Sequence, residues 1–85
     1  MGSTNGASKL AAEIGKRLKA ARARRGISQM RLAGECEVEP YQISNWERGV
    51  NMPTIPSLLK LCRALHTTLD DLCPVEAQEV ARHTQ

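Results

Sequence analysis

Side chains that can donate and accept hydrogen bonds follow one another closely near the middle of the chain. Tyr41, Gln42 and Asn45 fall within one short stretch, and a second polar pair, Ser28 and Gln29, lies earlier in the chain. Amide and hydroxyl groups bind polar surfaces without breaking covalent bonds, and an Asn or Gln amide can pair bidentately with adenine in a DNA groove. These residue types therefore indicate recognition rather than catalysis.

Residue types that serve catalysis or metal binding do not form a recognisable group. His66 and His83 have no companion motif, and neither a Gly-rich phosphate loop nor a pair of carboxylates is apparent. The three cysteines, Cys36, Cys62 and Cys73, fit neither a disulfide framework nor a zinc spacing. Cys36 and Cys62 are expected to be buried, with Cys73 the one open to oxidation. We expect no enzyme activity, no metal, no cofactor and no small-molecule ligand.

The basic residues are concentrated in the N-terminal half of the chain. The net charge is +3, and eight of the twelve Lys and Arg residues lie between Lys9 and Arg31, where Glu13 is the single acid. Taken alone, such a run favours a solvated helix face. Beside the two short helices that carry the polar residues named above, the basic run instead favours binding to nucleic-acid phosphates.

A small all-α domain must position these groups. At 85 residues the chain has room for one core, and because Phe is absent that core must come from smaller apolar side chains, which suits short packed helices. The first helix is predicted to begin with Ser8 as its N-cap and to end at Gly26. Its apolar stripe is Leu10, Ile14, Leu18 and Ala21.

Two short helices follow. Ser28 can cap the second helix. The inward residues of that helix are Leu32, Ala33 and Cys36. Residues 37–39 form a turn, and Pro40 suits the first position of a third helix because its missing amide leaves no donor unpaired there. Ile43 and Trp46 then face the core, which leaves the polar residues beside them outward.

Two further helices are predicted towards the C-terminus. Thr54 can cap a fourth helix, and Thr68 with Asp71 resembles a capping box that opens a fifth, which Pro74 limits. The apolar stripe of the fourth helix is Ile55, Leu58, Leu59, Cys62 and Leu65, widened by Leu61. A helix this apolar needs partners on two sides.

The chain thus divides into three parts. Residues 1–8 are expected to form a flexible arm, residues 9–73 a helix-turn-helix domain, and residues 74–85 a C-terminal tail with room for a short helix. No stretch approaches the roughly 18 apolar residues of a membrane span, and the N-terminus lacks the apolar core of a signal peptide. We expect a cytoplasmic protein without membrane contact.

Several blocks of residues in this frame carry a family resemblance. They are Gly26-Ile27-Ser28-Gln29 with Leu32-Ala33, Ile43-Ser44-Asn45-Trp46-Glu47-Arg48-Gly49, Leu58-Leu59-Lys60-Leu61-Cys62-Arg63-Ala64-Leu65, and Thr68-Leu69-Asp70-Asp71-Leu72. At these residues the chain resembles the lambda-repressor-like, Cro/C1-type (XRE-like) helix-turn-helix family of bacterial and phage regulators. The resemblance implies a compact five-helix domain whose third helix enters the major groove of double-stranded DNA.

The resemblance also implies roles for individual residues. The base-facing positions are Glu39, Pro40, Tyr41 and Asn45, with Gln42 at a base or phosphate position. Contacts to the DNA backbone are expected from Gln29, Arg31, Arg48 and Asn51. For Gln29, Tyr41 and Asn45 the alternative is plain solvent exposure. Arg22 and Glu47 match positions that form a partly buried ion pair, and with the inward Trp46 they are assigned to stability.

Three positions depart from the family pattern. Glu37 stands where the turn usually has a left-handed Gly, which implies a strain of roughly 1 kcal/mol if that conformation is kept. Glu39 and Pro40 replace the usual hydroxyl cap and one base-reading side chain. His66 stands where Gly usually follows the fourth helix, which predicts a left-handed residue there.

The leading functional hypothesis is a sequence-specific transcriptional regulator, in the first instance a repressor. Because one recognition helix covers few base pairs, we expect a homodimer on a palindromic operator. The dimer surface is expected around Leu69, Leu72 and Val75. The alternatives are a DNA-binding antitoxin of a toxin pair, and a protein-interaction module of the same fold without DNA binding. Glu37, Glu39 and Pro40 favour the interaction module. Phage repressor and restriction controller are subclasses that the sequence leaves open.

Overall fold

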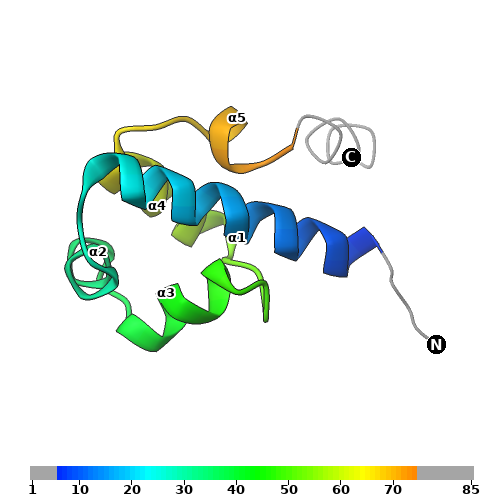
Figure 1. Ribbon diagram of the computed structural model, residues 1–85, viewed down its shortest axis with the longest axis horizontal. Coiled ribbons are helices and arrows are strands. Elements are labelled where there is room, and N and C mark those ends of the chain that lie inside the picture. The colour runs from blue at the N-terminus through cyan, green and yellow to red at the C-terminus, as the bar shows by residue number, and fades with distance from the viewer. Residues whose placement is uncertain (1–5, 75–85) are drawn as a thin grey trace.

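The computed structural model describes residues 6–74 and, from Lys9 onward, their side chains. Within that range the chain is all-helical (Figure 1). The helices are α1 (Gly6–Arg25), α2 (Gln29–Cys36), α3 (Pro40–Glu47), α4 (Ile55–Leu65) and α5 (Leu69–Leu72). The expected five-helix, all-α architecture is therefore confirmed. The predicted arm over residues 1–8 and tail over residues 74–85 fall largely outside the described residues.

α1 is the central helix, and α3, α4 and α5 pack directly against it. α2 and α3 contact each other, α3 also contacts α1, and α4 contacts α1, α2 and α5. Figure 1 shows α3 and α5 on opposite sides of α1. The α2–α3 pair is thus held from behind by α1 and α4, and the outer side of α3 is left uncovered.

The core is aliphatic, as the absence of Phe requires. The inward stripe of α1 is buried at Ile14, Leu18 and Ala21, and Leu10 packs on its edge. The other helices add Leu32, Ala33, Cys36, Ile43, Trp46, Leu58, Leu61, Leu65 and Leu72 to the same cluster. The periodicities predicted for α1, α2 and α3 are therefore confirmed.

A close approach of backbones sets α3 directly against α1. A Cβ atom at Gly15 would lie 2.4 Å from the carbonyl oxygen of Trp46. At Gly49, which has φ +74°, a Cβ would lie 3.0 Å from Ala12 Cα. Only glycine fits these two places without a shift of the backbone. The sequence analysis did not single out Gly15, because a glycine inside a helix carries no periodic signal.

The predicted helix caps are confirmed at three N-termini. The hydroxyl of Ser28 accepts the Arg31 amide at 2.9 Å, that of Thr54 accepts the Ser57 amide at 3.3 Å, and that of Thr68 accepts the Asp71 amide. Each such cap contributes about 1 kcal/mol. The prediction for Ser8 was wrong: α1 begins at Gly6, so Ser8 lies inside the helix. The residues around Ser8 include Ala7 and Lys9, which are good helix formers and let the helix extend.

The stripe predicted for α4 was wrong at two positions. Leu58, Leu61 and Leu65 are buried, but Ile55 and Leu59 are 65% and 48% exposed. At 3.6 residues per turn, Leu59 lies about 120° around the helix from Leu65 and so turns away from the core. α4 therefore carries an apolar side that nothing in the described part of the chain covers.

The expected dimer surface around α5 was also wrong in part. Leu72 is fully buried and so belongs to the interior of the monomer, whereas Leu69 is half-buried and packs against the edge of the core. The third residue of that expectation, Val75, lies outside the described residues. α5 thus contributes to the core through one turn of helix.

The cysteines divide between the core and its edge. Cys36 is buried as predicted, whereas Cys62 is only half-buried, like Cys73. Burial raises the pKa of each of the three thiols. Cys62 misses full burial because it lies at the edge of the α4 core face, beside the exposed Leu59.

Within residues 6–74, no helix combines the length and the apolar character that crossing a bilayer requires.

Candidate nucleic-acid interface

The turn between α2 and α3 keeps a left-handed residue although that residue is not glycine. Glu37 has φ 60° and ψ 41°, and its amide donates to the carbonyl of Gly34. The next amide, of Val38, donates back to the carbonyl of Ala33 at 3.0 Å. These bonds satisfy the last carbonyls of α2 and offset a strain of about 1 kcal/mol at Glu37. His66 likewise adopts the predicted left-handed conformation after α4, with φ 54°.

α3 begins at the predicted Pro40, but its start is stabilised in a way that the sequence analysis missed. Glu39 is the N-cap residue, and its backbone amide donates to the side-chain oxygen of Gln42 at 3.0 Å. This is the reverse half of a capping box, which needs Gln or Glu three residues after the cap. Gln42 therefore has a structural contact at the place where a base or phosphate contact was expected. The three-residue spacing of Glu39 and Gln42 in the sequence could have predicted this capping contact.

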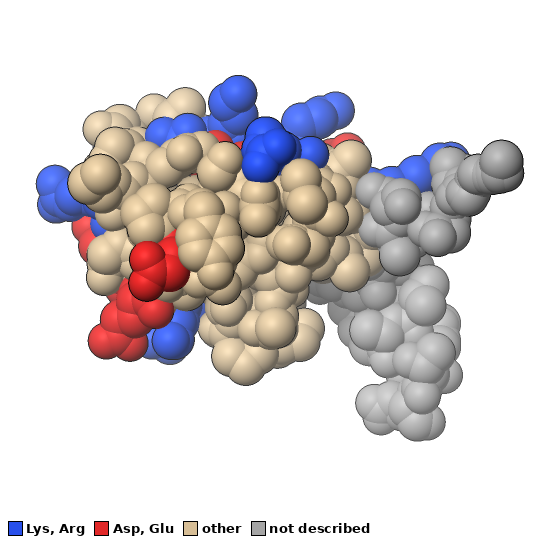
Figure 2. Space-filling model, turned by 90° about the horizontal axis from the view of Figure 1, so that it is seen from below, with Lys and Arg blue, Asp and Glu red and all other residues tan. Residues whose placement is uncertain are grey.

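One side of α3 packs against the core and the opposite side faces solvent. Ile43 and Trp46 are 0% and 5% exposed, whereas Tyr41 is 65% exposed. Seen from this side, the molecular surface is largely uncharged, with acidic side chains grouped where α2 leads into α3 (Figure 2). The helix thus presents hydrogen-bonding and aromatic groups along a projecting ridge.

The outward amide of Asn45 is held by its neighbour on the next turn. Arg48 Nη2 donates to Asn45 Oδ1 at 2.6 Å, and Arg48 Nε lies 3.4 Å from the hydroxyl oxygen of Ser44. Because the carbonyl oxygen of Asn45 accepts from Arg48, the side-chain nitrogen of Asn45 remains able to donate to a ligand. The structure therefore brings two of the predicted contact residues together, and Arg48 orients Asn45.

Glu47 joins three helices through one carboxylate. Arg22 of α1 donates to it through Nε at 2.6 Å and Nη2 at 3.1 Å, and Gln29 of α2 donates through Nε2 at 3.0 Å. Arg22 also donates to the carbonyl of Ile27. The predicted phosphate contact, Gln29, is thus anchored by its side-chain amide at the N-terminus of α2.

The pair of Arg22 and Glu47 is largely shielded from water. The Arg22 side chain is 18% exposed and that of Glu47 only 3%. The hydrogen bond that Arg22 donates to the Glu47 carboxylate raises the pKa of Arg22. Removing one partner from such a pair leaves an uncompensated charge and costs about 3 to 5 kcal/mol when burial is complete.

The other cation of α2 is tied into a surface network. Arg31 Nε lies 3.1 Å from Glu35 Oε2, and Arg25 Nη1 lies 2.8 Å from Glu35 Oε1. The hydrogen bond from Arg25, followed by that from Arg31, lowers the pKa of Glu35. Arg31 is exposed and able to reach a ligand, but its charge is partly balanced by Glu35 within the protein. Asn51, in the loop after α3, is exposed and carries no comparable constraint.

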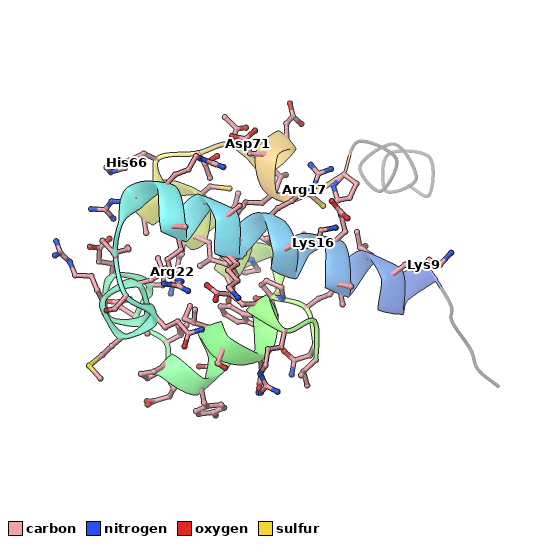
Figure 3. The ribbon with its side chains drawn as sticks, in the orientation of Figure 1. Lys9, Lys16, Arg17, Arg22, His66 and Asp71 are labelled. Carbon is pink, nitrogen blue, oxygen red and sulfur yellow. The ribbon has the colours of Figure 1, made fainter. Side chains whose placement is uncertain are left out.

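Much of the basic charge of α1 is used to hold the fold. Arg17 pairs with Glu13 and lies 3.5 Å from the carbonyl oxygens of Asp70 and Asp71, and Arg25 donates to the carbonyl of Ala64. Figure 3 shows Arg17 reaching towards α5 and Arg22 pointing from α1 towards α2. The exposed Lys9, Lys16, Lys19 and Arg24 form the outer basic side of α1. Part of the basic run predicted to bind phosphates therefore stabilises the fold, because its arginines donate to other parts of the protein.

The charges of the α2–α3 unit have the opposite balance. Residues 29–48 contain two cations, Arg31 and Arg48. Their acids are Glu35, Glu37, Glu39 and Glu47. Glu37 is strongly exposed, and Lys60 Nζ lies 3.8 Å from its carboxylate oxygen Oε1. The projecting unit thus has a formal net charge of −2, of which the buried Glu47 is compensated by Arg22 of α1.

Comparison with known proteins gives a family and several similar structures. The helix-turn-helix family model HTH_3 matches residues 18–72. The chain is 34% identical to the P22 c2 repressor solved with a synthetic operator, over 72% of this chain and 92% of that one, with a TM-score of 0.69. It is 29% identical to the restriction-modification controller C.AhdI from Aeromonas hydrophila, over 73% and 94%, with a TM-score of 0.70. For the clp gene regulator ClgR from C. glutamicum the identity is 30%, the coverage 74% and 81%, and the TM-score 0.71. No curated protein matches the chain.

Proposed function

The chain belongs to the helix-turn-helix family of Cro/C1-type regulators, and from this membership we propose that it is a transcriptional regulator that binds double-stranded DNA. The observation that carries the proposal is the uncovered ridge of α3, which projects Tyr41 and Asn45 while Ile43 and Trp46 fix its inner side to the core. A helix presented in this way fits the major groove of B-DNA. The expected location is the cytoplasm, because the DNA lies there. The similar repressor and controller structures support this assignment over an enzyme.

Base recognition is proposed to centre on Asn45. With Arg48 on one lone pair of its carbonyl oxygen, the amide nitrogen donates to a purine N7 and the second lone pair accepts from the exocyclic amine of adenine. Tyr41 can lay its ring against a thymine methyl group. Glu39 and Pro40 stand at the leading end of the helix, where Glu39 accepts from cytosine.

Contacts to the sugar-phosphate backbone are proposed to flank α3. Gln29 lies at the N-terminus of α2, where backbone amides and the helix dipole favour an anion. Arg31, Gln42, Arg48 and Asn51 complete the set of proposed contacts. Because residues 29–48 carry a net negative charge, we expect hydrogen bonds to supply more of this contact than charge does.

The regulator is proposed to act as a homodimer, in the first instance as a repressor. One recognition helix reads only a few base pairs, and a two-fold dimer doubles the site to a palindrome with half-sites about 34 Å apart. Repression follows when such a dimer covers a promoter.

Binding to selected and to random duplexes, followed by fluorescence anisotropy over a salt series, tests the proposal. A selected palindrome should bind about 10³-fold more tightly than random DNA. Asn45→Ala should weaken binding to the selected site by about 10- to 100-fold and leave random DNA almost unaffected. The matched control, Lys16→Ala on the outer side of α1, should affect both duplexes equally. Binding that ignores sequence in the wild-type chain would overturn the proposal.

One observation favours a second function, a protein-interaction module that does not bind DNA. The exposed acids Glu37 and Glu39 stand at the leading end of α3, where phosphates would repel them. A basic protein surface would suit that end better than DNA. Absence of binding to both duplexes in the experiment above would assign the chain to this second function.

A further inference from the structure

The loop after α3 and the outer side of α4 carry large apolar side chains that the described part of the chain leaves exposed. Val50, Met52, Ile55 and Leu59 are 58%, 40%, 65% and 48% exposed, and we call them the 50–59 surface. Ile55 and Leu59 are four residues apart and so lie on one side of α4. Exposed large apolar side chains that gather in this way mark an interaction site in a monomer.

The 50–59 surface also lacks charge. Residues 49–59 contain no Lys, Arg, Asp or Glu, although a quarter of the chain is charged. Figure 2 shows uncharged surface continuing from the α3 side to the lower edge of the view. The absence of charge restricts which partner the surface suits.

We propose that the 50–59 surface binds a second copy of this chain across a two-fold axis. The identification rests on the proposed function, which needs two recognition helices. In a two-fold contact the same patch lies on both copies, so a patch that carried charge of one sign would face its like. The chain carries a net charge of +3 and repels its own copy, and an uncharged apolar patch is the kind of surface that can pair with itself. A partner of another kind would gain from charge complementarity that this surface does not offer.

The position of the 50–59 surface next to the end of α3 also fits a second copy of the chain. The Gly49 amide donates to the carbonyl of Trp46, and the Val50 amide donates to the carbonyl of Asn45 at 2.9 Å, so the start of the surface is fixed to the end of α3. A two-fold axis beside the end of α3 would bring the ends of the two recognition helices close together, as neighbouring half-sites on one duplex require. α5 lies on the opposite side of α1 from α3 (Figure 1), so an axis through α5 would hold the two recognition helices farther apart.

A pair of opposite charges at one position tests the proposal on the full chain. Ile55→Glu and Ile55→Lys place like charges across the two-fold axis, and each should weaken self-association by at least about 30-fold in sedimentation velocity. An equimolar mixture of the two variants should restore the dimer. Because Ile55 is 65% exposed, both variants should keep the thermal midpoint of the wild type, which confirms that they are folded.

Met30→Glu is the matched control. Met30 is 71% exposed and apolar but lies on α2, outside the 50–59 surface. The control should dimerise like the wild type. Equal dimerisation of Ile55→Glu, or a mixture of the two charge variants that stays monomeric, would overturn the proposal.

DNA binding separates failure of this inference from failure of the proposed function. Ile55→Glu should bind a single half-site as the wild type does and lose its preference for the palindrome. A wild-type chain that binds its selected DNA but is monomeric up to about 100 µM, free and bound, would overturn the dimer surface and leave the function standing. It would mean that another partner, or residues 75–85 of the same chain, covers the surface. A dimer that binds no DNA would support the surface and refute the function.

Discussion

α1 and the α2–α3 unit carry opposite charge and use it differently. α1 contains seven cations and one acid, yet Arg17, Arg22 and Arg25 are bonded within the protein. Residues 29–48 contain four acids and two cations and still form the projecting part of the molecule. A basic stretch of sequence is therefore not the same thing as the recognition surface. Here much of the basic charge of α1 holds the fold, and the unit that carries the proposed recognition residues has a formal net charge of −2.

The ion pair between α1 and α3 offers the largest test of this comparison. Glu47→Ala should lower the free energy of unfolding by about 3 kcal/mol, because Arg22 would lose its charged partner and Gln29 its acceptor. Denaturant unfolding followed by circular dichroism measures the loss. Glu13→Ala, which breaks a more exposed pair on the same helix, should lower the free energy of unfolding much less, because water screens an exposed ion pair. Equal losses in the two variants would contradict the structural role of Arg22.

The close backbone contact between α1 and α3 can also be disrupted without changing a charged residue. Gly15→Ala should destabilise the protein by about 1 to 3 kcal/mol, because the new methyl group would lie 2.4 Å from the carbonyl oxygen of Trp46. Gly34→Ala is the control in α2, where a Cβ meets no atom within 4 Å. That variant should gain about 0.5 to 1 kcal/mol from helix propensity. Thermal unfolding of the two variants should therefore shift in opposite directions.

A smaller effect is expected from reducing the acidity of the ridge. Glu39→Gln removes one exposed negative charge near the proposed phosphates and should tighten binding to random duplex roughly two- to fivefold at low salt. Anisotropy titrations measure this change. Glu13→Gln on α1 removes the same charge away from the ridge and should have less effect. Unchanged or weaker binding of Glu39→Gln would place the DNA elsewhere on the molecule.

The smallest expected effect concerns pH. Hydrogen bonds from Arg25 and Arg31 hold the pKa of Glu35 below its ordinary value of 4.5. A lowered pKa in the folded state stabilises the fold above pH 4.5, and this stabilisation is lost as the pH falls through the folded pKa. Stability profiles of the wild type and Glu35→Gln should therefore converge as the pH falls from 4.5 through the folded pKa. Profiles that stay parallel in that range would argue against the network.

Local patterns in the sequence predicted most of the fold. The caps at Ser28, Thr54 and Thr68 and the left-handed residue at His66 are decided by neighbouring residues, and all were confirmed. The family and its lambda-repressor-like fold were confirmed by the match over residues 18–72 and by the similarity to the P22 repressor. Such features need no knowledge of distant parts of the chain.

Features that depend on distant contacts were missed. Whether Ile55 and Leu59 are buried depends on how far the other helices wrap around α4, and periodicity alone does not report that. The requirement for Gly15 arises from the backbone of Trp46, which is far away in the sequence. The tethering by Arg17 and Arg25 is likewise invisible in composition. The contacts proposed for Asn45, Tyr41 and the phosphate-facing residues stay predictions.

The carboxylate of Glu47 has a consequence for the DNA rather than for the protein. Because this carboxylate joins α1, α2 and α3 at a buried point, the angle between α2 and α3 has little freedom to adapt to a duplex. If the helix pair is rigid, the DNA has to change conformation on binding, by bending or twisting until its major groove fits α3. The free energy of that deformation depends on the stiffness of each base step, including steps that no side chain reaches. We therefore expect part of the sequence preference to arise at base pairs that the protein does not touch.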